Sequence, residues 1–308
     1  MVTDISPLWD NALTRVLTDQ EKDNAVRAIF HTTMNELRTE ARGQAHGQAA
    51  VELLDSIIGN ITLLLPSDRD PPHFNLTLSP NNEDDDDHGT NDPNHVDTYC
   101  LYSLAILKYW VYYDRYQAGS NLIFGTFKGR DVYNTTVVVA GNFLYVPSVM
   151  YALLSFRNNT DRLINYAILG TQIADAVWSH VIRTFKSKRP AEDKWDILKC
   201  SDSEGLPKVQ MFEPLLSTWT AAKAAMTDAW YSTMDSLGPL KVTPSQVFYM
   251  LVFYHHVCSS EINIMDGKII SQFMTTLRDF NSAFQCPKGR NTSVCEEVFA
   301  ETAVQRIM

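Results

Sequence analysis

Hydrophobic periodicity limits the fold of this chain more than any other feature of its sequence. Between residues 17 and 42, one helical face carries Val26, Ile29, Phe30, Thr33, Met34 and Leu37. Similar patterns predict helices over residues 48–58, 98–117, 161–185, 212–234, 243–257 and 268–284. In the helix over 212–234 we expect Pro214 in the first turn, where a missing N–H is tolerated. The sequence therefore predicts a mainly α-helical protein with a few strands.

Two threonines have the spacing of helix N-caps. Thr18 is followed three residues later by Glu21, which is the pattern of a capping box. Thr243 is followed by Pro244 and by Gln246, which suit the first and third helical positions. We therefore expect Thr18 and Thr243 to cap the helices that follow them.

An uncharged stretch of 22 residues, 135–156, is about long enough to span a membrane. Asn142, Pro147 and Ser148 interrupt its centre, and β-branched residues dominate its first half. We therefore favour a buried strand followed by a helix over a membrane span.

Residues 66–97 are rich in Pro, Asn and Asp and lack periodicity, which predicts an acidic flexible loop. The acidic run 83–87 could attract calcium, but it lacks the Asp-x-Asp-x-Asp-Gly spacing that fixes calcium ligands. We interpret the run as a solvated charged loop.

Composition limits the partners and the compartment. The 308 residues are 45% hydrophobic, enough for a large core, and the formal net charge of −10 disfavours nucleic acids and anionic membranes. The first residues show no apolar stretch of signal-peptide length, so either the chain is cytosolic or an N-terminal region is missing. Secretion is favoured by five scattered cysteines and by five N-glycosylation motifs, at Asn60, Asn75, Asn134, Asn158 and Asn291.

Standard catalytic motifs do not occur in the sequence. A zinc helix needs two histidines four residues apart, and no two of the eight histidines have that spacing. The G-x-S-x-G elbow, the P-loop and the G-x-G-x-x-G turn are also missing. The residues by themselves therefore indicate no enzyme class.

Short motifs nevertheless follow one another in a recognisable order. They are LTDQE (17–21), VVVAGNFLYVPSV (137–149), NYAILG (165–170), FE (212–213), TPSQVFY (243–249), VC (257–258) and FNSAFQC (280–286), before a last cysteine, Cys295. In order and spacing they resemble the C-terminal half of the neprilysin family of zinc metalloendopeptidases, over nearly the whole chain. The resemblance implies a degenerate thermolysin-like zincin fold. Residues 1–65 would end a helical lid-type domain, 66–97 would form the acidic loop, and 98–308 would form the peptidase domain.

The departures from the family fall on its chemistry. Counted from Asn165, Asp175 stands at the first zinc histidine of the HExxH motif, Ala176 at the catalytic glutamate and Ser179 at the second zinc histidine. Glu213 keeps the third ligand position.

Two further family positions are also changed. Ser217 replaces the aspartate that would orient a ligand histidine, and Asp266 stands near the family's transition-state histidine. The resemblance also implies a disulfide between Cys200 and Cys295, whereas the pairing of Cys100, Cys258 and Cys286 stays open.

These replacements predict that zinc and catalysis are lost. A carboxylate and a hydroxyl in place of two imidazoles do not build a tight tetrahedral zinc site, and hydrolysis loses its nucleophile and its base. Asp175, Ser179 and Glu213 could instead form an oxygen-only calcium or magnesium site. We favour the simpler alternative, in which the carboxylates are solvated or hydrogen-bonded to neighbouring residues.

The resemblance therefore predicts an inactive pseudopeptidase without a cofactor. It would bind peptides or proteins outside the cell, as a secreted protein or as an ectodomain whose N-terminal membrane anchor is missing. The alternatives are an active zinc metalloendopeptidase with misassigned ligands and a non-enzymatic helical interaction protein in the cytosol.

Overall fold

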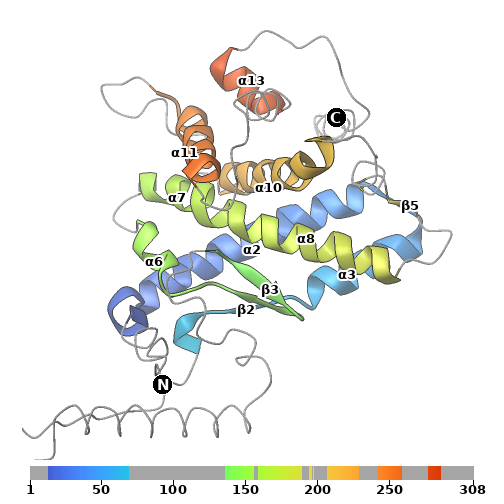
Figure 1. Cartoon of the computed structure of the whole chain (residues 1–308), viewed down its shortest axis with the longest axis horizontal. Helices are drawn as coiled ribbons and strands as arrows, with labels where there is room; N and C mark the ends of the chain where they lie inside the picture. The colour runs from blue at the N-terminus through green and yellow to red at the C-terminus, as the bar shows by residue number, and fades with distance from the viewer. Residues whose placement is uncertain are drawn as a thin grey trace, which may run out of the picture.

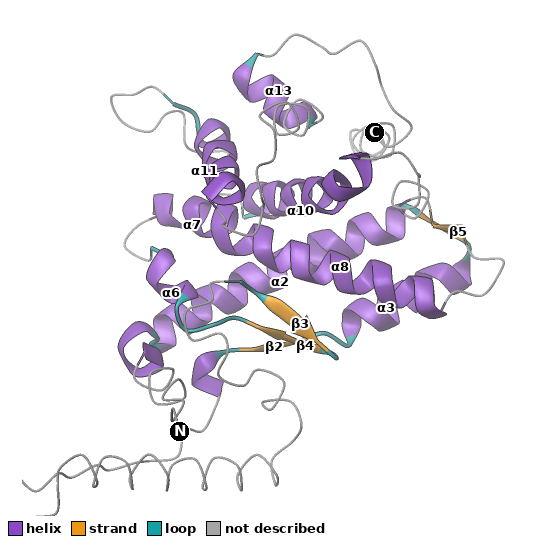
Figure 2. Ribbon diagram, viewed as in Figure 1, coloured by secondary structure: helices purple, strands orange, loops and turns teal. Residues whose placement is uncertain are grey.

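The computed structural model describes residues 13–68, 136–155, 159–188, 194–195, 197, 207–228, 242–258 and 277–285. These residues are mostly helical and carry a small three-stranded sheet (Figures 1 and 2). The predicted mainly helical fold with a few strands is thus confirmed at this level. The helix expected over 98–117 and most of the acidic loop lie outside the described residues.

Helix α2 (Gln20–Gly43) buries the predicted apolar face, and α3 (Gln48–Gly59) follows it where a helix was expected. The expected cap at Thr18 is wrong by one residue. The carboxylate of Asp19 accepts a hydrogen bond of 2.8 Å from the Lys22 N–H and caps α2. Thr18 instead donates its hydroxyl proton to the Thr14 carbonyl oxygen at 2.7 Å, because a helical turn over 13–17 precedes it.

The helix predicted over 161–185 is longer and contains one widened turn. It consists of α7 (Asn159–Asn165), the π-helical turn η2 (Tyr166–Gly170) and α8 (Thr171–Lys188) without a break. A Cβ at Gly170 would lie 3.2 Å from Tyr166 Cδ1 and 3.7 Å from Ala221 Cβ. The tight contact is with the Tyr166 ring of the same widened turn, whereas the distance to Ala221 of α10 is an ordinary van der Waals contact, so glycine leaves room for that ring.

Helix α10 (Pro207–Thr227) begins before the position expected from the sequence. Pro214 therefore lies inside the helix and not in its first turn, so that prediction is wrong. Proline has no N–H to bond the carbonyl of residue 210, but the helix continues because the residues after it are buried in the core. Helix α10 ends at Thr227, and residues 229–234, over which the apolar pattern predicts a continuation, lie outside the described residues.

The C-terminal described helices are α11 (Pro244–Cys258) and α13 (Arg278–Phe284), which pack against each other. The predicted cap of α11 is confirmed. The Thr243 N–H donates to Gln246 Oε1 at 2.9 Å, and the Gln246 N–H donates to Thr243 Oγ1 at 3.3 Å. The part of the last predicted helix before Leu277 lies outside the described residues.

The uncharged stretch forms two strands and a single helical turn. In the sheet, β4 (Phe143–Tyr145) pairs parallel with β2 (Thr62–Leu64) and antiparallel with β3 (Val138–Ala140). Gly141, with φ of +58°, makes the turn between β3 and β4. The single strand expected here is therefore a hairpin, and α6 (Met150–Leu153) follows it. No helix within the described segments is both long and apolar enough to cross a membrane.

Two short connections complete the described elements. The turn η1 (Pro66–Asp68) follows β2, and β1 (Ala45–His46) pairs antiparallel with β5 (Lys194–Trp195). The Trp195 indole N–H donates to the Ala41 carbonyl oxygen at 3.2 Å, which ties this pair of strands to the end of α2.

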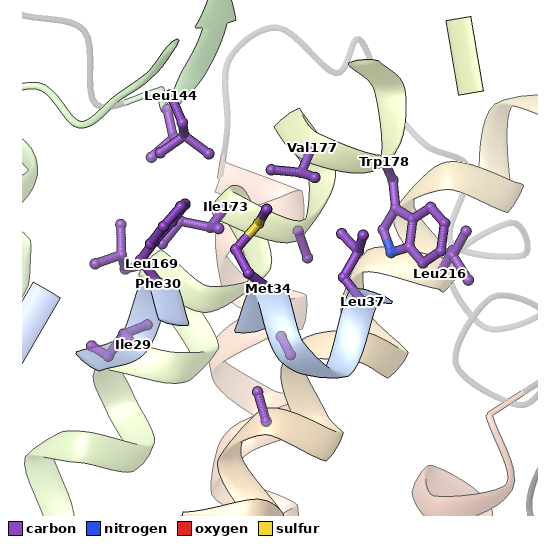
Figure 3. Packing of buried hydrophobic residues seen from close by; sticks show 14 of the residues in the cluster. Ile29, Phe30, Met34, Leu37, Leu144, Leu169, Ile173, Val177, Trp178 and Leu216 are labelled. Carbon is purple, nitrogen blue, oxygen red and sulfur yellow. The ribbon is translucent and has the colours of Figure 1, made fainter. Parts of the chain in front are cut away.

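One hydrophobic core joins the described elements. Helix α8 packs against α10, α2 and α3, and Figure 3 shows side chains of α2 facing those of η2 and α8. The α2 side chains labelled there are Ile29, Phe30, Met34 and Leu37. Described residues before 65 thus share one core with described residues after 98. The predicted boundaries between the lid-type domain, the acidic loop and the peptidase domain stay predictions.

Buried polar groups also connect α2 to its neighbours. Asp23 accepts hydrogen bonds from the hydroxyl groups of Tyr151, at 2.7 Å, and Ser67, at 2.5 Å. Burial and then the contact with Asp23 raise the pKa of the Tyr151 hydroxyl. On the side toward α10, Lys223 forms an ion pair with the buried Glu40. These contacts fix the position of α2 beside α6 and α10.

Candidate functional site

Four of the residues singled out in the sequence meet between α8 and α10. Helix α8 contributes Asp175 and Ser179, one turn apart, and α10 contributes Glu213 and Ser217, also one turn apart. Residues four apart lie on the same face of a helix, so each helix presents one carboxylate and one serine to the other.

The two helices exchange hydrogen bonds through these side chains. The Ser179 hydroxyl donates to Glu213 Oε2 at 2.9 Å. The Ser217 hydroxyl lies 3.2 Å from Asp175 Oδ1 and 2.7 Å from the Glu213 carbonyl oxygen, so its single proton is shared between two acceptors. Contacts between 175 and 217 and between 179 and 213 require that α8 and α10 run antiparallel. We call these four residues the serine–carboxylate clamp.

The members of the clamp differ in their access to solvent. Ser217 is fully buried, Ser179 and Glu213 are half-buried, and Asp175 is exposed. Protein atoms nevertheless surround the Asp175 carboxyl group, and this partial loss of water is the main reason that its pKa rises to about 6. The hydrogen bond from Ser217 opposes the rise, and the nearby charge of Glu213 adds to it. The clamp is therefore an acidic feature that solvent reaches at Asp175.

Ala176 stands where the resemblance predicts a catalytic base. Its methyl group is half-buried and packs against the hydrophobic core, so it offers no proton acceptor. His180 lies nearby in the sequence but belongs to another contact, because its Nε2 is 3.5 Å from the Thr184 hydroxyl. Burial lowers the pKa of His180, and the positive charges of Arg183 and Lys188 lower it further.

The core side of α8 holds this segment in place independently of the clamp. Leu169, Ile173 and Val177 are fully buried, as expected from the sequence, and Ile168 is partly buried against the core. The Trp178 indole N–H donates to the Thr220 hydroxyl of α10 at 2.9 Å. Packing and this buried hydrogen bond therefore hold the two helices together beside the clamp.

The donor set of the clamp does not fit a tetrahedral zinc ion. It has two carboxylates and two hydroxyls and no imidazole or thiolate, and each hydroxyl is already engaged with a carboxylate. Across the described segments, no group of three or more His, Cys, Asp and Glu side chains is arranged to hold a metal ion. Both carboxylates accept hydrogen bonds from neighbouring serines, and the expected absence of a metal stays a prediction.

Several residues expected to matter lie outside the described residues. Asp266 is one of them, so its proximity to the clamp stays a prediction. The others are Cys100, Cys200, Cys286, Cys295, Asn75, Asn134, Asn158 and Asn291. Cys258 ends α11, but its side chain is not described. Asn60 is described and is exposed at the C-terminal end of α3.

The sequence did not reveal how the two helices pair. Thr220 was not recognised as the partner of Trp178, and Ser217 was noted only as a replacement for an aspartate. The usable signal was the repeated spacing of a carboxylate followed by a serine four residues later, at 175 and 179 and again at 213 and 217. Two such faces complement each other once the helices are antiparallel.

Comparisons of this chain with protein-family models, with curated proteins and with solved structures return no match.

Proposed function

We propose that this protein is a catalytically inactive, neprilysin-like pseudopeptidase that binds peptides or proteins outside the cell. Its fold would be a degenerate thermolysin-like zincin domain, in which α8 corresponds to the helix of the HExxH motif. The protein would be secreted or form the ectodomain of an anchored protein, with N-linked glycans and a disulfide between Cys200 and Cys295.

The observation that carries this proposal is the meeting of the four clamp residues. The motif order alone, without any spatial information, assigns Asp175 and Ser179 to the two zinc histidines and Glu213 to the third ligand. In the structure, Ser179 contacts Glu213 directly, and Ser217 connects Asp175 to the backbone of Glu213. Residues more than thirty positions apart in the sequence are thus neighbours, as ligands of one former metal site must be. This supports the assignment.

Hydrogen bonds take over the connection that a metal would supply between the two helices. Zinc attaches its ligands to one centre and contributes directly to the stability of the site. Here two serines and two carboxylates link α8 to α10 across the same interface. The scaffold therefore persists without a metal, but it has neither the activated water nor the base that hydrolysis needs.

Restoring the ligands tests the inherited geometry. We expect the triple variant Asp175→His/Ala176→Glu/Ser179→His, which retains Glu213, to bind close to one zinc ion per chain and to melt at a higher temperature with zinc than without. The matched control is Asp175→Asn/Ala176→Gln/Ser179→Asn, which has similar side-chain volumes and no zinc ligands at these positions. A folded triple variant that binds no more zinc than this control contradicts the proposed geometry.

Peptide retention tests the binding function itself. The immobilised full-length chain is incubated with a defined pool of synthetic peptides, and mass spectrometry identifies what is retained and whether it is intact. We expect a subset of peptides to be retained uncleaved. Cleavage that a chelator abolishes would support an active metallopeptidase instead, and the absence of any retained peptide would contradict the binding role.

A further inference from the structure

The end of α3 presents a glycosylation motif in a form suited to modification. Asn60, Ile61 and Thr62 form the sequence Asn-x-Thr at the junction between α3 and β2. The side chains of Asn60 and Thr62 are exposed, whereas Ile61 between them is buried. The backbone is fixed at both ends, because the Asn60 N–H donates to the Ser56 carbonyl oxygen and the Thr62 N–H donates to that of Asn142.

The asparagine and threonine side chains that define the motif are also unengaged within the described residues. The Asn60 amide and the Thr62 hydroxyl make no hydrogen bond with any residue that the structure describes. An N-linked glycan is bulky, so a folded chain accommodates it only where the asparagine side chain is exposed at the surface and is not held by a neighbouring residue. Both conditions are met at Asn60.

We infer that Asn60 is an N-glycosylation site of this protein, an inference that rests on the extracellular location proposed above. The donor class is an oligosaccharide carried on a lipid diphosphate. A bond forms between Asn60 Nδ2 and the anomeric carbon of the first sugar, and the bond from that carbon to the diphosphate oxygen breaks. The lipid diphosphate leaves, and Nδ2 loses one proton. No oxidant or reductant takes part.

A glycan at this position leaves the clamp open. Helix α3 packs against α8, and in Figure 1 α3 and α10 lie on opposite sides of α8. The clamp lies between α8 and α10, so α8 separates it from α3. A glycan at Asn60 would therefore leave the clamp uncovered.

The experiment uses the full-length chain, secreted from cultured insect cells behind a cleavable signal peptide. Peptide N-glycosidase treatment in heavy-oxygen water converts each glycosylated asparagine to a labelled aspartate, which mass spectrometry locates. We expect the label at Asn60 in the wild-type chain. The variants Asn60→Gln and Thr62→Ala should lose it together with the mass of one glycan, and the matched variant Thr62→Ser should keep it.

The outcomes separate this inference from the proposed function. An unlabelled Asn60 in secreted wild-type protein overturns the inference, whether or not other motifs carry glycans. Because Asn60 and Thr62 are exposed, we expect the variants to retain the circular dichroism spectrum of the wild type. Zinc content and peptide retention of the same preparations report on the pseudopeptidase separately, and removal of the glycan should leave peptide retention unchanged.

Discussion

The buried hydrogen bond between Trp178 and Thr220 gives the sharpest prediction about the scaffold that positions the clamp. Both side chains are fully buried, and the indole N–H of α8 donates to the α10 hydroxyl at 2.9 Å. The Thr220 hydroxyl in turn donates to the Leu216 carbonyl oxygen at 2.8 Å. Thr220→Val keeps the side-chain shape and removes the acceptor, so the indole N–H is left buried without a partner.

The cost of that orphaned donor sets the expected magnitude. A buried polar group that loses its partner costs about 1–3 kcal/mol of unfolding free energy. In a Trp178→Phe background the N–H is gone, so Thr220→Val should cost close to nothing, although Trp178→Phe is itself destabilising because it leaves a cavity. The double-mutant cycle should therefore return a coupling of about 1–2 kcal/mol between the two positions.

Urea unfolding of the four proteins measures this coupling, and agreement between circular dichroism and fluorescence checks for a single transition. Thr220→Ser is the control, since it keeps the hydroxyl and loses one methyl group, at a cost of about 1 kcal/mol. The serine hydroxyl still accepts the indole hydrogen bond, so Trp178→Phe should cost the same in the Thr220→Ser background as in the wild type. If Thr220→Val costs the same in both backgrounds, the hydrogen bond does not stabilise the pairing of α8 and α10, and the reasoning fails.

Three further predictions concern the clamp, the widened turn and a helix cap. The pKa of Asp175 rises to about 6 in the folded chain, so its charge destabilises the fold fully above that pH and not at all below its ordinary pKa of 3.8. Asp175→Asn should therefore raise the free energy of urea unfolding near neutral pH, by no more than about 1 kcal/mol because solvent reaches the residue, and should not raise it near pH 4; a pH-independent difference would contradict this. Gly170→Ala should destabilise the fold by about 1–3 kcal/mol, because its Cβ would lie 3.2 Å from Tyr166 Cδ1. In the control Gly59→Ala, the new Cβ meets only the end of a flexible arginine at 3.8 Å, so this variant should be neutral or stabilising, and equal urea midpoints for the two variants would refute the steric argument. In thermal unfolding, Thr243→Ala should lower the unfolding free energy by about 1 kcal/mol and Thr243→Ser by much less. If serine lowers it as much as alanine does, the hydroxyl does not cap α11.

Local sequence signals predicted most helices and missed features that depend on neighbours. The capping box at Thr243 and the apolar face of α2 are properties of a few adjacent residues, and both were predicted correctly. The extension of α10 through Pro214 was missed, because burial of the following turns outweighs the one hydrogen bond that proline removes. The apolar pattern predicts one strand where the structure has the hairpin of β3 and β4. The pattern does not reveal the left-handed turn at Gly141, because apolar runs lie on both sides of it.

Four of the predicted site residues lie together in the structure, Asp266 lies outside the described residues, and the contacts among the four were not predicted. Motif order placed Asp175, Ser179, Glu213 and Ser217 in one site, and the structure brings them together. The exchange of hydrogen bonds between a serine on each helix and a carboxylate on the other depends on the antiparallel register of α8 and α10. Register is set by the burial of residues such as Trp178 and Leu216, which a motif does not encode.

Zinc content of the purified wild-type chain tests the central claim most directly. The full-length protein is incubated with excess zinc, freed of unbound metal by gel filtration, and analysed by inductively coupled plasma mass spectrometry while a peptide pool is assayed for cleavage. We predict zinc far below one ion per chain and no cleavage that a chelator inhibits, because two carboxylates and two hydroxyls occupy the site. One zinc ion per chain, with peptide hydrolysis that stops when the metal is removed, would contradict the account.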